Sequence, residues 1–168
     1  STLCDIMMGL LQSTRGAMYL DDTLVQVDNI NRYRAIVAQV PQNVFLSDSD
    51  FYENVTTCAS DNLLDHEKQY VRDLCSKLQL NDFIMDLPDE YNTSVGERGA
   101  RISGGQRQRL GIARALYCRP EILFLDEVTS ALDEKTANEV MDTIYSLSDV
   151  TIVIISHDRS TLDRCNTI

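Results

Sequence analysis

Residues 99–133 limit what this chain can fold into more than any other stretch. They place Ser103-Gly104-Gly105-Gln106 at the start of a helical pattern that runs to Cys118. Serine is a good N-cap, and paired glycines let backbone N–H groups approach a ligand closely. A helix N-terminus suits phosphate, because its N–H groups are unpaired and its dipole end is positive. The stretch therefore predicts a helix start that can face an anion.

A short apolar run follows this helix and ends in two carboxylates. Residues 122–125 fit a parallel strand that is covered on both faces, and Asp126-Glu127 come directly after it. Carboxylates at the C-terminal end of such a strand lie where open α/β sheets bind ligands. The runs 36–40 and 150–155 are further buried strands, and they alternate with helical patterns. The chain is therefore predicted to be an α/β protein with a parallel sheet.

In this order, the helix start and the strand end resemble the signature motif and the Walker B motif of ATP-binding-cassette (ABC) ATPases. The resemblance implies a P-loop NTPase fold, with a RecA-like parallel sheet and a helical insertion. It implies that residues 1–42 and 116–168 form a partial ATP-binding core. Residues 43–115 would form a helical subdomain that ends in the signature motif.

The same resemblance assigns roles at the phosphates. The signature residues would contact the γ-phosphate of an ATP held by the opposite subunit; they are Ser103, Gly104, Gly105 and Gln106. Asp126 would help hold Mg²⁺, and Glu127 would polarise the attacking water. Adjacent carboxylates beside a metal and a triphosphate separate ion binding from base catalysis.

Three further residues match motifs that surround this pair. Gln42, after Val40-Pro41, matches the Q-loop glutamine, which senses Mg²⁺ and passes motion to membrane domains. His157, after the strand at 150–155, matches the switch histidine that hydrogen-bonds the γ-phosphate. Asp133 ends a segment that matches the D-loop at the dimer interface, and it is also expected to be a helix N-cap.

The chain contains no phosphate loop of the form G-x-x-x-x-G-K-[ST], because none of its three lysines follows a glycine. Ser1-Thr2 stand at the start of a helical pattern over 2–11. They resemble the residues just after the Walker A lysine. Ser1 would then supply a hydroxyl to Mg²⁺, and both residues would bind nucleotide. We therefore expect a chain cut inside the cassette, without its N-terminal strands and phosphate loop, and inactive alone as an ATPase.

Two loops indicate the subclass. Residues 93–99 resemble the loop before the signature in ABC exporters, which touches the coupling helices. The sequence at residues 45–50 resembles the corresponding segment in transporters of lipid-linked sugars. The implied function is the nucleotide-binding domain of an exporter of a lipid, a lipid-linked sugar or another substrate, on the cytoplasmic face of the cell membrane. Its partners would be a second nucleotide-binding domain and a transmembrane domain. A soluble ABC ATPase of ribosomes or DNA repair, or an inactive interaction fragment, stay open as alternatives.

Composition narrows the remaining classes. A net charge of −11 argues against a nucleic-acid partner, which would need a basic face. The five cysteines show no C-x-x-C spacing, so we expect reduced thiols without disulfides, with Cys75 and Cys118 in buried settings. No apolar run approaches the ~18 residues of a membrane span.

The strand pattern also predicts a topology. Short strands are expected at 17–20 and 23–27, around a turn at Asp21-Asp22. In the main sheet, we expect the parallel order 151–155, 122–126, 36–40. The strand at 151–155 would then lie at an edge with its outer side unpaired.

Overall fold

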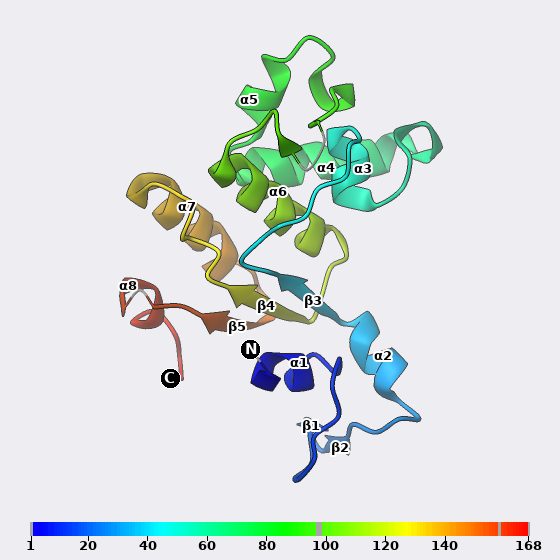
Figure 1. The fold of residues 1–168 in the computed structure, drawn as a ribbon, viewed down its shortest axis with the longest axis vertical. Coiled ribbons are helices and arrows are strands. Elements are labelled where there is room, and N and C mark those ends of the chain that lie inside the picture. The colour runs from blue at the N-terminus through cyan, green and yellow to red at the C-terminus, as the bar shows by residue number, and fades with distance from the viewer. Residues whose placement is uncertain (1, 97–98, 158, 168) are drawn as a thin grey trace.

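A parallel three-stranded sheet forms the centre of the computed structural model, which describes residues 2–96, 99–157 and 159–167 (Figure 1). Its strands are β3 (Val37–Val40), β4 (Ile122–Asp126) and β5 (Thr151–Ile155), in the order β3-β4-β5. Both pairings are parallel. The predicted strand order is confirmed, and β5 is an edge strand of this sheet.

The two faces of β4 belong to different parts of the core. Leu123 and Leu125 are fully buried in the larger apolar cluster, which also contains residues from the helices over 65–77, 104–117 and 134–145. Phe124 packs on the opposite side with Cys4 and Met8. This separation follows from strand geometry, because successive side chains point to opposite faces of a sheet.

The segment before β3 is less regular than its sequence indicates. It contains α1 (Thr2–Met7), the antiparallel pair β1 (Tyr19–Leu20) and β2 (Thr23–Leu24), and α2 (Ile30–Ala35). The helix expected over 2–11 ends early, because Gly9 has a left-handed φ of 72°. The strands expected at 17–20 and 23–27 exist but are shorter, and α2 was not anticipated.

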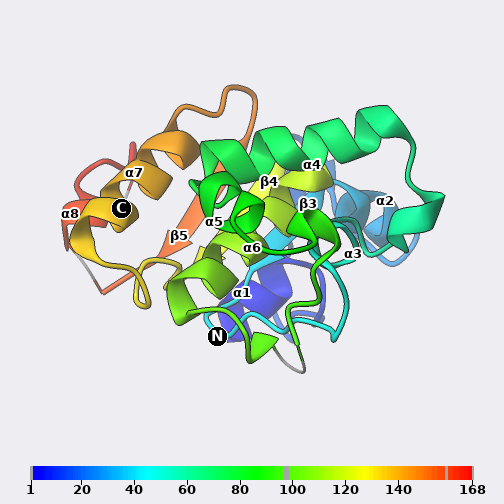
Figure 2. The same cartoon turned by 90° about the horizontal axis from the view of Figure 1, so that it is seen from above.

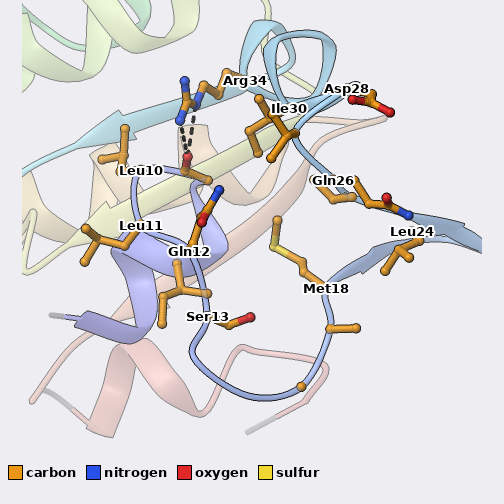
Figure 3. Close-up of a pocket in the computed structure, with 16 residues that line it drawn as sticks. Leu10, Leu11, Gln12, Ser13, Met18, Leu24, Gln26, Asp28, Ile30 and Arg34 are labelled. Atoms are coloured by element: carbon orange, nitrogen blue, oxygen red, sulfur yellow. Dashed lines mark hydrogen bonds between the residues drawn. The ribbon is translucent and has the colours of Figure 1, made fainter.

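Side chains of α2 hold the end of α1. The Tyr33 hydroxyl donates to the Met7 carbonyl, and Arg34 donates to the Gly9 carbonyl through Nε at 3.0 Å. Figure 3 shows Arg34 reaching this carbonyl at the rim of a hollow of about 610 Å³. Leu10 and Leu11 line that hollow, and among the described residues none of the predicted site residues does.

Helices between β3 and β4 stand together on one side of the sheet (Figures 1 and 2). They are α3 (Phe51–Thr56), η1 (Ser60–Asn62), α4 (Asp65–Lys77), α5 (Asn81–Met85), η2 (Glu90–Asn92) and α6 (Gly104–Tyr117). The mostly helical character predicted for 51–90 is confirmed. The apolar stripe of α4 is buried, with Val71 and Cys75 fully covered. After β4 come α7 (Glu134–Tyr145) and, after β5, α8 (Arg159–Leu162).

Helix α6 holds the chain that leaves β3. Gly111 lies so close to Val44 that a Cβ at Gly111 would stand 2.5 Å from Val44 Cγ2. Further along α6, Arg114 donates to the Phe45 carbonyl at 2.8 Å and to the Asn54 carbonyl at 2.7 Å. The loop after β3 is therefore fixed by contacts with one helix.

All five cysteines are among the described residues, and none forms a disulfide. Cys75 is fully buried, as predicted, but Cys118 is exposed. Cys118 is the C-cap of α6, where the helix leaves the core, so the burial predicted for it was wrong. Over the described residues, the helices are too short or too polar to cross a membrane.

The close approach of α6 to Val44 leads to a stability prediction. Gly111→Ala should destabilise the fold by about 1–3 kcal/mol, because the added methyl group overpacks the contact with Val44. Urea unfolding followed by circular dichroism measures this. Lys135→Ala, at an exposed position of α7, is the control and should change stability by no more than about 0.5 kcal/mol. An unchanged midpoint for Gly111→Ala would show that Val44 moves aside at little cost.

Candidate functional site

Three predicted residues meet at the C-terminal edge of the sheet. Gln42 follows β3, Glu127 follows β4 and His157 follows β5. The Gln42 amide donates from Nε2 to Glu127 Oε2 at 2.5 Å. His157 Nε2 lies 3.0 Å from Glu127 Oε1. One carboxylate thus has both of its oxygens engaged by residues from the two neighbouring strands.

The backbone of Glu127 is unusual for its residue type. Its φ is 48°, in the left-handed region that side chains other than glycine rarely adopt. Its N–H donates to the Ile155 carbonyl at 2.9 Å, which continues the β4–β5 pairing beyond the strand. Its carbonyl accepts from the Ser130 N–H at 3.1 Å. Such local strain persists where surrounding contacts fix it, and it is frequent at functional sites.

Exposure differs within this cluster. The side chain of Glu127 is 23% exposed, whereas that of His157 is 92% exposed. The carboxylate is therefore held in a partly desolvated position, and the imidazole is open to anything that approaches from solvent. The Glu127 carboxylate is thus suited to be a fixed acceptor, and the exposed His157 imidazole beside it is suited to be a donor that can turn.

Asp126 is the last residue of β4 and pairs in register with Ile155. Strand alternation places it on the same face as Phe124, the face that packs on α1. Thr2 is the first residue of that helix. Ser1, the proposed Mg²⁺ hydroxyl, lies outside the described residues.

The second cluster of predicted residues lies at the start of α6. Ser103 is the N-cap: its Oγ accepts from the Gln106 N–H at 3.1 Å. Gln106 Oε1 accepts in return from the Ser103 N–H at 2.8 Å. This capping box confirms the predicted helix start. Within the described part of the chain, no hydrogen bond or ion pair joins it to Gln42, Glu127 or His157.

The start of α6 lies against the loop that follows β4. A Cβ on Gly105 would stand 3.1 Å from Leu132 Cδ2 and 3.3 Å from the Ala131 carbonyl. Glycine at this position therefore permits the close approach of loop and helix. The next residue, Asp133, is the N-cap of α7, as predicted, and accepts from the Thr136 N–H at 3.0 Å. Hydrogen bonds from Thr136 lower the pKa of Asp133, with a smaller contribution from Arg109.

Two residues of α6 were not anticipated as parts of the site. Gln108 is buried, and its Nε2 donates to the Pro41 carbonyl at 3.4 Å, next to Gln42. Arg109 donates to the carbonyls that end α4. Polarity was the available signal, because residues 106–109, between the glycines and Leu110, are all polar.

The donor set bears on metal binding. No group of three or more His, Cys, Asp or Glu side chains within 2–96, 99–157 and 159–167 could hold a metal ion. Mg²⁺ is commonly held by one or two carboxylates together with substrate phosphates and water. The pair of carboxylates at the end of β4, Asp126 and Glu127, fits that mode of binding and does not fit a metal cage made by protein alone.

Comparison with known proteins identifies the family. Residues 1–130 match the family model described as "ABC transporter". The chain belongs to the ABC transporter family. It is 34% identical to the ATP-dependent lipid A-core flippase of Saccharophagus degradans, over 100% of this chain and 28% of the flippase. It is 36% identical to the colicin V secretion/processing ATP-binding protein CvaB of Escherichia coli, over 96% of this chain and 22% of that protein.

A solved structure supports the same assignment. The chain matches the structure of a bacterial Atm1-family ABC exporter with ATP bound, with a TM-score of 0.85 and 31% sequence identity. The match covers 97% of this chain and 28% of that exporter chain. The fold is thus that of the P-loop NTPases, and this ABC chain spans about a quarter of the length of these relatives.

The capping box gives a second stability prediction. Ser103→Ala should destabilise the chain by about 1 kcal/mol, because the Gln106 N–H loses its acceptor at the start of α6. Ser103→Asp is the matched control, since aspartate is an equally good N-cap. Chemical unfolding of both variants measures the difference. Equal losses of stability in the two variants would show that the loss does not come from the missing acceptor for the Gln106 N–H.

Proposed function

We propose that this chain is the ATP-binding and ATP-hydrolysing part of an ABC exporter. One observation carries the proposal: the Glu127 carboxylate is held between Gln42 and His157 where three parallel strands end. ATP hydrolysis requires a positioned acceptor for the proton of the attacking water. In this proposal, residues 1–42 and 116–168 form the core, and residues 43–115 form the helical subdomain.

Glu127 is the general base of the proposed reaction. Its carboxylate accepts a proton from water that attacks the γ-phosphate, and the hydrogen bond from Gln42 fixes which way the carboxylate points. His157 lies on the other carboxylate oxygen and is exposed, so its imidazole can turn to donate to a γ-phosphate oxygen. A positioned base of this kind contributes about 10²–10⁴-fold to a rate.

Mg²⁺ is the metal that fits these residues, and ATP is the substrate. Asp126 and the Gln42 amide oxygen would hold Mg²⁺, since the Gln42 amide nitrogen is already engaged by Glu127. Ser1 would add a hydroxyl to the metal, and Ser1 and Thr2 would face the nucleotide. When bound, Mg²⁺ neutralises charge on the phosphates and polarises them toward attack.

The start of α6 serves a different ATP in this proposal. Ser103, Gly104, Gly105 and Gln106 contact the ATP of a second nucleotide-binding domain, and Asp133 lies in the loop that meets that partner. The separation of the two clusters supports this division, because the helix start makes no bond to the Glu127 cluster over the described residues. The loop over residues 93–99 would face a transmembrane domain, as its resemblance to exporter loops implies.

The exporter class is favoured by the relatives. The similar proteins include a lipid A-core flippase, a colicin secretion protein and an Atm1-family exporter. We therefore place this chain at the cytoplasmic face of a cell membrane, with a lipid or lipid-linked sugar as one candidate substrate. A soluble ABC ATPase, the competing class, has no comparable observation in its favour.

The proposal predicts a separation of binding from turnover. In the full-length gene product, Glu127→Gln should reduce ATP turnover by about 10²-fold or more, because the carboxylate that accepts the proton is lost. Binding of MgATP should persist, since the amide keeps the size of the side chain and one of its two acceptor oxygens. Phosphate release and equilibrium nucleotide binding measure the two effects. Turnover near that of the unaltered protein would remove Glu127 from this role and refute the proposed site.

A second prediction concerns residues 1–168 alone. This polypeptide should bind MgATP weakly and should not hydrolyse it at a useful rate, because it contains no G-x-x-x-x-G-K-[ST] cradle. Its net charge of −11 also disfavours a polyanion. Titration calorimetry with MgATP tests this, and fusion to the phosphate-loop segment of a relative is the control. Micromolar binding with turnover by residues 1–168 would show that another part of the chain cradles the phosphates.

A further inference from the structure

Another hollow lies at the edge of the sheet where β4 and β5 begin, away from the residues that follow the strands. Its volume is about 320 Å³, and it is bounded by the ends of α4, α6 and α7 and by the residues just before the two strands. Most of its lining is apolar, from Tyr70, Leu74, Leu78, Leu116, Leu147 and Val150. Small-molecule sites are typically hollows of about 300–1,000 Å³ with an apolar lining and a few polar groups.

Hydrogen bonds between the three helices fix the walls of this hollow. The Thr143 hydroxyl of α7 donates to the Lys77 carbonyl at the end of α4, at 3.2 Å. The Tyr70 hydroxyl of α4 donates to the Leu116 carbonyl near the end of α6, at 3.4 Å. The hollow is therefore formed before any ligand arrives, as is usual for binding sites of small molecules.

Four charged side chains also line the hollow, and their charges cancel. Lys77 and Arg119 are cationic, whereas Glu121 and Asp149 are anionic. Within the part of the chain that the structure describes, none of the four forms an ion pair. The Arg119 guanidinium lies instead over the ring of Tyr70, at 4.7 Å from its centroid. Arg119 is thus already engaged by the lining, while the two carboxylates are not.

The ends of three helices make the hollow electrostatically negative. Helices α4, α6 and α7 end at Lys77, Tyr117 and Tyr145, and residues beside each of these ends line the hollow. A helix C-terminus carries about half of an elementary negative charge. Since the side-chain charges cancel, the three ends decide the sign, and the net charge of −11 on the whole chain acts in the same direction. The hollow therefore favours a cation.

We propose that this hollow binds a small amphipathic cation, an amine with an aromatic or aliphatic body. The body lies on Leu74, Leu147 and Val150, and the ammonium group lies at the mouth beside Asp149. Asp149 is exposed and follows the end of α7, so its carboxylate and the helix end act on the same charge. The site shares no residue with the proposed ATP site, and the inference does not depend on the proposed function.

An anion bound by Lys77 and Arg119 is the opposite possibility, and three probes that share one ring system separate the two. They are naphthylmethylammonium, neutral naphthylmethanol and anionic naphthylacetate. Fluorescence anisotropy measures their binding to the full-length gene product near neutral pH. We expect the ammonium to bind most tightly and the carboxylate to bind at least about tenfold more weakly. Equal or tighter binding of naphthylacetate would overturn the proposal.

Two substitutions should change the affinity for naphthylmethylammonium in opposite directions. Asp149→Asn should weaken binding by about three- to tenfold, because the carboxylate is lost. Asparagine also tolerates the left-handed φ of 65° at this position, so the fold should be kept. Lys77→Gln should strengthen binding by about two- to threefold, because it removes a competing cation. The matched control is Asp61→Asn, an exposed carboxylate of η1 outside the hollow, which should leave affinity unchanged.

Amide hydrogen exchange locates the bound probe in the unaltered protein. Saturation with naphthylmethylammonium should slow exchange at residues 147–151 and 119–121, while exchange at 42–44 and 126–128 stays the same. This readout decides the proposal even if Asp149→Asn fails to fold. Slower exchange only outside 147–151 and 119–121 would overturn the proposal, as would unchanged affinity in a folded Asp149→Asn variant.

Discussion

The hydrogen bond from the Glu127 N–H to the Ile155 carbonyl holds the residue on which the proposed site depends. It fastens the end of β4 to the end of β5 and stabilises the left-handed backbone of Glu127. Because all three strands are parallel, their ends bring Gln42 and His157 to the same carboxylate. A slip of one residue in the β4 register would exchange the faces of Asp126 and Glu127 and remove this arrangement.

Helix α6 connects this strand edge to the rest of the chain. Gln108 bonds the carbonyl of Pro41, Gly111 packs on Val44, and Arg114 bonds the carbonyl of Phe45. The segment that carries Gln42 is therefore positioned by successive turns of one helix. The start of that same helix carries the Ser103 cap and the glycines. A displacement of α6 would therefore move the helix start and disturb the contacts that hold the segment after β3.

Strong local signals account for the parts of the structure that the sequence predicted. The apolar run at 122–125 and the S-x-x-Q capping box fixed the position of β4 and the start of α6. Helix α2 escaped prediction because six residues are too few to repeat an apolar stripe. Tertiary bonds stabilise it instead, from Tyr33 to Met7 and from Arg34 to Gly9. Such bonds have no signature in sequence spacing.

The contacts within the candidate site could not be predicted from sequence spacing either. Gln42 and Glu127 are 85 positions apart, so a bond between them exists only once the sheet has formed. The resemblance to ABC ATPases identified the candidate site residues, whereas the hydrogen bond from Arg109 to the turn after α4 became visible only in the structure. Local rules thus locate each motif, and tertiary structure alone decides which motifs touch.

Charge imposes the last condition on the proposed site. Asp126 and Glu127 are adjacent carboxylates in a chain of net charge −11, and the proposed substrate is a triphosphate. Glu127 receives two hydrogen-bond donors, but these are an amide and an imidazole, and neither neutralises a phosphate. The repulsion must therefore be balanced by a divalent cation on one side and by helix N-terminal N–H groups on the other. In the proposed function, the two carboxylates would therefore admit the triphosphate only together with its metal, and the start of α6 would contact only an ATP that a partner holds.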